Sequence, residues 1–96
     1  MIIRIAEEAE FDLEEGWRFY DDIEVGLGDY FLDSLYSDID SLQVTAGLHR
    51  KQFGKFRLLS SKFPFGIYYT TFSEATVVHA VLDLRREPSW LRGRIS

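Results

Sequence analysis

The end of the chain gathers residues that are suited to binding a charged partner: Arg85, Arg86, Trp90, Arg92 and Arg94. Each guanidinium carries a charge that does not titrate and a fork of N–H donors that matches a carboxylate. Arginine and tryptophan also dominate the energetics of protein interfaces. The cluster therefore predicts a surface that contacts an acidic protein partner.

A structural role is the alternative for each of these arginines. Arg85 and Arg86 lie beside two acids in the sequence, Asp83 and Glu87, and further acids fill the first half of the chain. An ion pair with any of these carboxylates would hold the fold together instead of contacting a partner. Both roles remain open from the sequence.

The charge of the chain is divided between its two halves. Residues 1–48 carry 13 acidic residues and two basic ones, whereas residues 49–96 carry nine basic residues and three acidic ones. A basic half favours an anionic partner, while the net charge of −5 argues against indiscriminate binding to nucleic acid.

Several other kinds of chemistry lack the residues that they need. The chain has no cysteine, so it has neither disulfides nor thiolate metal ligands. The two histidines, His49 and His79, have no second ligand at a metal-binding spacing. Gly26 and Gly28 are too close together for a phosphate-binding loop and follow a helical segment. We expect no metal and no cofactor.

Two helices and a strand are predicted in the acidic half. The β-branched residues 2–5 predict a strand, and apolar residues that recur every three or four positions predict an amphipathic helix over residues 6–23, with its acidic side in water. A second periodic run predicts a helix over residues 30–42. Asp29 could cap this helix, or its first turn could already include Leu27 and Gly28.

The basic half reads as strands. Residues 43–54 have no periodicity and predict a loop. Strands are predicted at 55–61, 65–72 and 76–84. Pro88 prevents the last strand from continuing, and residues 89–92 predict a final helical turn. The order β-α-α-β-β-β predicts a single α+β domain over residues 1–96, in which a helical hairpin packs on a small, mainly antiparallel sheet. No segment is apolar enough to span a bilayer, so we expect a soluble cytoplasmic protein.

Three strings of residues resemble the RelE/ParE toxin superfamily, and the ParE-like plasmid-stabilisation toxins in particular. The first resembles their helical hairpin and consists of Ala9-Glu10-Phe11-Asp12-Leu13, Tyr20 and Leu27-Gly28-x-x-Phe31-Leu32. The second resembles their third strand and is Phe63-Pro64-Phe65-x-Ile67-Tyr68-Tyr69. The third resembles their closing segment and is Ala80-Val81-Leu82-x-x-Arg85-Arg86-Glu87-Pro88-Ser89-Trp90, followed by Arg92 and Arg94. The resemblance implies the toxin of a type II toxin–antitoxin pair. Some members of this superfamily inhibit DNA gyrase, and others cleave messenger RNA on the ribosome.

Under the RelE-type alternative, the resemblance makes Lys55, Arg57 and Arg86 the candidate catalytic residues of a ribonuclease. Lys55 and Arg57 alternate on one strand and so point to one face. Phe65-Gly66 stands where those nucleases place an arginine, however, and no tyrosine follows the last strand. Without a charge stabiliser and an acid, the transition state would lose several kcal/mol of stabilisation. We therefore expect a binding protein rather than an enzyme.

The antitoxin is the partner that the resemblance implies, in a toxin–antitoxin hetero-oligomer. Antitoxins of this superfamily wrap the toxin with an amphipathic helix and an extended segment, so exposed apolar residues on the helical hairpin are candidate contacts: Phe11, Phe19 and Tyr30. The arginine and tryptophan cluster then becomes the target-binding surface, with DNA gyrase as the target. A degenerate toxin that retains only antitoxin binding is a further alternative.

Overall fold

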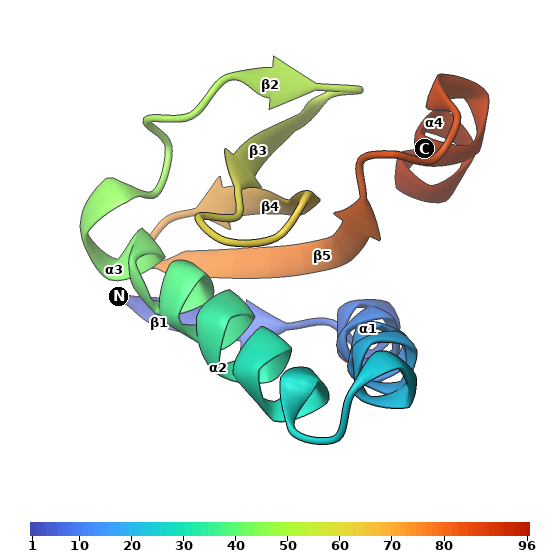
Figure 1. Ribbon diagram of the computed structural model, residues 1–96. Helices are drawn as coiled ribbons and strands as arrows, with labels where there is room; N and C mark the ends of the chain where they lie inside the picture. The colour runs from blue at the N-terminus through green and yellow to red at the C-terminus, as the bar shows by residue number, and fades with distance from the viewer.

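The computed structural model describes residues 1–96 as five strands and four helices (Figure 1). In chain order these are β1 (Ile2–Ile5), α1 (Glu7–Ile23), α2 (Leu27–Asp40), α3 (Leu42–Thr45), β2 (Lys51–Gln52), β3 (Lys55–Leu59), β4 (Phe65–Phe72), β5 (Ala75–Asp83) and α4 (Pro88–Ile95). None of the helices is both long and apolar enough to span a membrane.

The strands form one sheet in the order β1-β5-β4-β3-β2. β1 runs parallel to β5, and every other neighbouring pair is antiparallel. The register of β4 against β5 shifts between Tyr68 and Tyr69, so His79 has no partner opposite it. The predicted α+β class and the mainly antiparallel sheet are confirmed.

The hairpin of α1 and α2 covers one face of the sheet (Figure 1). The buried stripe of α1 packs against α2 and the sheet because apolar residues recur at helical spacing. At the centre of this core, the Phe31 ring lies 4.9 Å from the Phe65 ring and 5.1 Å from the rings of Tyr20 and Phe63. Gly16 of α1 faces Phe31 directly and leaves room for that ring.

A second, smaller core lies on the opposite face of the sheet, under α4. Ala80 and Leu82 belong to this core, whereas Val81 belongs to the hairpin core, because successive residues of a strand point to opposite faces. Leu91 and Ile95, four residues apart on α4, cover Tyr68, Ala80 and Leu82. The sheet is therefore packed on both faces, with α4 placed over β4 and β5.

The prediction of a loop over residues 43–54 is wrong at both ends. α3 continues the α2 helix by one turn, and β2 pairs with β3 across a two-residue turn. Both turn residues, Phe53 and Gly54, have positive φ values of 57° and 85°. Tight hairpin turns require this conformation, but phenylalanine rarely adopts it, so the turn has no sequence signal.

One helix boundary differs from expectation, and another settles an alternative that the sequence leaves open. α4 runs from Pro88 to Ile95, two turns instead of one, because proline is favoured in the first turn and Leu91 and Ile95 are buried on one side. α2 begins at Leu27, so Gly28 does belong to its first turn. The Asp29 carboxylate does not cap α2; Asp21 of α1 accepts hydrogen bonds from the backbone N–H groups of Gly26 and Gly28 instead.

Candidate functional site

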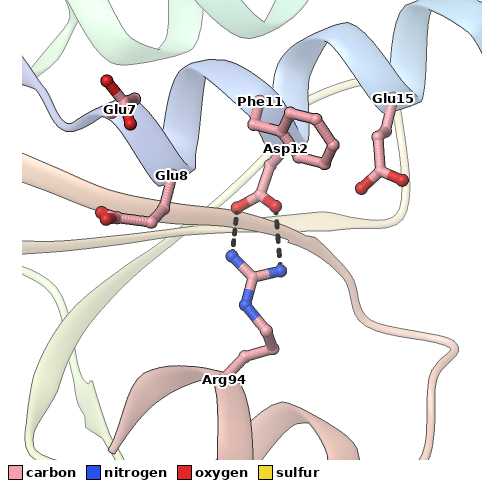
Figure 2. A pocket seen from close by; sticks show the side chains of 6 residues that line it. All are labelled: Glu7, Glu8, Phe11, Asp12, Glu15 and Arg94. Carbon is pink, nitrogen blue, oxygen red and sulfur yellow. Dashed lines mark hydrogen bonds and ion pairs between the residues drawn. The ribbon is translucent and has the colours of Figure 1, made fainter.

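An ion pair between the buried Asp12 and the half-buried Arg94 joins α1 to α4. Two nitrogens of the Arg94 guanidinium lie 2.9 Å from the two carboxylate oxygens of Asp12 (Figure 2). Asp12 is 6% exposed and also accepts a hydrogen bond of 3.0 Å from the N–H of Val81. This N–H lies on β5 beyond the last residue that pairs with β1. Asp12 therefore supplies the hydrogen-bond acceptor that this β5 N–H lacks in the sheet, and it also fixes the position of α4. Its hydrogen bonds raise the pKa of Arg94.

A hollow of about 370 Å³ opens on one side of this ion pair. Figure 2 shows its lining: Glu7, Glu8, Phe11, Asp12, Glu15 and Arg94. Apart from Asp12, these acids form no ion pair. The hollow thus combines an exposed aromatic ring with unpaired negative charge.

A second hollow of about 330 Å³ continues on the other side of the ion pair. Its lining comes from α1, β4, β5, the β5–α4 connection and α4: Asp12, Glu15, Gly16, Phe19, Phe65, Val81, Leu82, Asp83, Arg86, Trp90 and Arg94. The two hollows share Asp12, Glu15 and Arg94. Together we call them the α1–α4 cleft.

Arg86 and Trp90 form the rim of this cleft on the α4 side. The Arg86 guanidinium lies over the Trp90 ring, 3.7 Å from its centroid, and Arg94 approaches the same ring at 5.7 Å. A cation held over an aromatic face is attracted by the ring quadrupole. Arg86 is exposed and has no carboxylate partner, so its charge stays available at the surface.

The other two arginines of the predicted cluster lie elsewhere. Arg85 binds Asp83 through its backbone N–H at 2.9 Å and its side chain at 2.6 and 3.0 Å, and these hydrogen bonds lower the pKa of Asp83. Arg92 faces the Phe53 ring at 5.4 Å, beside the β2–β3 turn. The geometry favours a structural role for Arg85 and Arg94 and leaves Arg86, which lies over the half-buried Trp90 ring, as an exposed arginine without a carboxylate partner.

The residues predicted to contact an antitoxin divide in the same way. Phe11 and Phe19 line the α1–α4 cleft and are 56% and 53% exposed. Tyr30 lies outside it, with its ring 5.6 Å from Phe63 and under the Lys62 ammonium. The structure therefore brings Phe11 and Phe19 into one cleft with Arg86 and Trp90, although the sequence analysis assigns these pairs to two different surfaces.

The candidate nuclease residues do not converge on one site. Arg86 lines the α1–α4 cleft, which neither Lys55 nor Arg57 lines. The Lys55 ammonium donates to the carbonyl of Ile95 at 3.3 Å, at the end of α4. The aliphatic part of Arg57 covers Gly66 so closely that a Cβ there would lie 3.2 Å from it. A side chain at position 66 would therefore require Arg57 or the neighbouring Leu84 to shift.

Two tyrosines that could substitute for a catalytic acid are in the core. Tyr68 is fully buried under α4, and its hydroxyl has no hydrogen-bond partner. Tyr69 is buried on the hairpin side, where its hydroxyl accepts from the N–H of Gly47 and is hydrogen-bonded to His49; burial raises the pKa of Tyr69. Neither tyrosine lines the α1–α4 cleft.

The histidines have local structural partners. His79 Nε2 lies 2.8 Å from the Thr70 hydroxyl, and burial, reinforced by the charge of Lys55, lowers the pKa of His79. No group of three or more histidines and acids is arranged to hold a metal ion.

Sequence reasoning missed Asp12, the residue around which the cleft is built. The whole acidic side of the first helix was expected in water, and for Asp12 this is wrong. A signal was present, because Asp12 directly precedes Leu13 and falls three residues after Ala9, within the buried stripe.

No family model matches the sequence, and no curated protein matches it. Among solved structures, a chain of the chromosomal ParDE TA system from P. aeruginosa has the same fold, with a TM-score of 0.78. The match covers 88% of this chain and 96% of that chain at 13% sequence identity. The ParE-like fold that the sequence resemblance implied is therefore confirmed.

Proposed function

We propose that this chain is the toxin of a type II toxin–antitoxin system, which acts by binding a cellular target and is neutralised by a cognate antitoxin. Its shared fold with a chain of the ParDE TA system supports the toxin–antitoxin assignment. The observation that carries the mode of action is the α1–α4 cleft, whose two hollows are lined by Phe11 on one side and by Phe19, Arg86 and Trp90 on the other.

The target-binding part of the cleft is the Arg86–Trp90 rim. An exposed guanidinium fixed on an aromatic ring loses little side-chain entropy when it binds a carboxylate, and arginine and tryptophan are the commonest interface hot spots. Behind them, Phe65, Val81 and Leu82 line an apolar floor. This combination fits an acidic protein surface with an apolar anchor, and DNA gyrase is the target that we propose.

Neutralisation follows from the same geometry. An antitoxin segment that packs on Phe11 and Phe19 occupies the cleft and covers the Arg86–Trp90 rim. Tyr30, on the far side of the hairpin, is a second contact for a segment that wraps around α1 and α2. The proposal places the protein in the cytoplasm, within a toxin–antitoxin hetero-oligomer until the antitoxin is lost.

The geometry supports binding over RNA cleavage. Lys55 is engaged by the end of α4, Gly66 is closely covered by Leu84 and Arg57, and the Tyr68 hydroxyl is buried. Metal-free cleavage of RNA needs a base, an acid and charge stabilisation within reach of one phosphate. Of the candidate residues, Arg86 lines the α1–α4 cleft, whereas Lys55 and Arg57 do not.

Induced expression in cells that lack the antitoxin tests this proposal. We expect growth arrest with a DNA-damage response and intact messages, and inhibition of DNA supercoiling by purified gyrase. Rapid cleavage of translated messages would instead establish the RelE-type ribonuclease. Normal growth at high expression would establish a degenerate toxin whose remaining role is antitoxin binding.

A further inference from the structure

The outer edge of β1 presents unpaired backbone groups. The N–H groups of Ile2 and Ala6 donate to carbonyls of the β5 side, Glu74 and Val78, each at 2.9 Å. The backbone N–H and C=O groups of successive residues point alternately to one side of a strand and to the other, so those of Ile3 and Ile5 point away from β5. No hydrogen bond joins these groups to another part of the chain. An edge of this kind is a template for a further strand.

β1 has few of the usual protections of an edge strand, namely its length of four residues and a single charge. It contains no proline, bulge or lysine, and its one charged residue, Arg4, projects to the face opposite the hairpin, because Ile3 and Ile5 pack on the hairpin core. The other edge of the sheet, β2, is only two residues long and carries Lys51. β1 is therefore the edge at which another chain can pair.

An acidic hollow lies directly beside this edge. It has a volume of about 640 Å³, and its lining comes from β1, α2 and α3: Ile3, Asp33, Tyr36, Ser37, Ile39, Asp40 and Gln43. Asp33 and Asp40 are exposed and form no ion pair. They are two turns apart on α2, about 10 Å along the helix axis. The hollow thus has an apolar floor and negative charge at its wall.

We propose that an extended, cationic segment of another protein binds here by adding a strand to β1. Its backbone would pair with Ile3 and Ile5, and every second side chain would enter the hollow. A lysine or arginine at such a position covers the apolar floor with its methylene groups and reaches Asp33 or Asp40 with its charge. This surface is separate from the α1–α4 cleft, and the inference does not depend on the proposed function.

A second copy of this chain is a poor occupant. Pairing β1 with β1 of another copy would bring two sets of Asp33 and Asp40 to one interface, and like charges brought together oppose association. The chain has only one base, Arg4, between residues 1 and 17, so its own β1 segment cannot neutralise the hollow. A basic segment of a different protein can pair with the free backbone groups of β1 and also neutralise the carboxylates of Asp33 and Asp40.

Selection from a displayed library of random seven-residue segments tests the inference with the whole chain as bait. We expect the enriched segments to carry lysine or arginine at alternate positions. The double variant Asp33→Asn/Asp40→Asn should weaken their binding about tenfold, since two carboxylates lose their charge at sites that stay exposed. The matched control Asp22→Asn/Glu24→Gln changes two exposed acids at the end of α1 and should leave binding unchanged.

Amide hydrogen exchange locates the backbone contact. The amides of Ile3 and Ile5 should exchange rapidly in the free chain and become protected in the complex with an enriched segment. A selection without basic binders would overturn the inference. So would binders that tolerate the Asp33→Asn/Asp40→Asn change or leave exchange at Ile3 and Ile5 unaltered.

Discussion

Asp12 holds three parts of the molecule together through one carboxylate. It satisfies the free N–H of Val81, receives both donors of Arg94 and lies on the floor of the α1–α4 cleft. A buried carboxylate is stable only when its lone pairs are used, because an unpaired buried charge is expensive. The ion pair therefore sets the position of α4 and, with it, the position of Trp90.

Removal of Arg94 should be costly for this reason. Arg94→Gln leaves the Asp12 charge buried without its counter-ion, and we expect a loss of about 2–3 kcal/mol in the free energy of unfolding. Urea denaturation measures this loss. Arg18→Gln is the control, because it breaks the exposed pair with Glu14 and should cost less than about 1 kcal/mol. Equal losses for the two variants would show that the Asp12–Arg94 pair is not buried as described.

His79 should make the stability of the fold sensitive to mild acid. Burial and the nearby Lys55 lower its pKa, so the unfolded chain binds a proton more tightly than the folded chain. Stability is then fully present above the ordinary histidine pKa of about 6.5 and falls as the pH is lowered from there towards the folded pKa.

Unfolding free energies at about pH 7.5 and about pH 5.5 check this, since histidines are the side chains that ordinarily titrate in this window. We expect wild type to lose stability at the lower pH and His79→Gln to lose less. An unchanged pH dependence in His79→Gln would mean that another group is responsible.

At the scale of elements, close packing of α1 on α2 depends on Gly16. A Cβ there would lie 2.5 Å from ring atoms of Phe31, which is fully buried. We expect Gly16→Ala to lower the free energy of unfolding by about 1–3 kcal/mol through this overlap, even though alanine is favoured in a helix by about 1 kcal/mol.

The same substitution in α4 should have the opposite sign. A Cβ at Gly93 would meet no atom within 4 Å, so Gly93→Ala gains helix propensity without a clash, up to about 1 kcal/mol. Thermal unfolding of both variants compares them directly. If both glycine variants shifted stability in one direction, the packing of Phe31 on Gly16 would be in doubt.

The elements that the sequence predicts are those with a strong period or composition. The stripe of α1 and the β-branched run of β5 are long enough to fix their type. β2 was not predicted, because a two-residue strand depends on its pairing with β3 and on a turn in which Phe53 takes an unusual conformation. The length of α4 was underestimated, because its helical form is stabilised by contacts of Leu91 and Ile95 with the distant strands β4 and β5.

At the scale of the whole molecule, the division of charge along the chain becomes a division of surfaces. The acids of α1 and α2 line the α1–α4 cleft and the hollow beside β1, whereas Arg86 remains free at the cleft rim. The sequence identified Arg86, Trp90, Phe11 and Phe19 as candidates. It could not show that they share one cleft, because that depends on how α4 docks against α1.

Colony formation after induced expression without antitoxin tests the toxin assignment and the role of the cleft together. We predict that wild type lowers the number of colonies by several orders of magnitude, and that Arg86→Ala/Trp90→Ala restores growth while remaining folded by circular dichroism. Arg92→Ala, which changes an arginine outside the cleft, should remain toxic. A harmless wild type, or a double variant as toxic as wild type, would contradict the proposal that this chain is a toxin acting through the α1–α4 cleft.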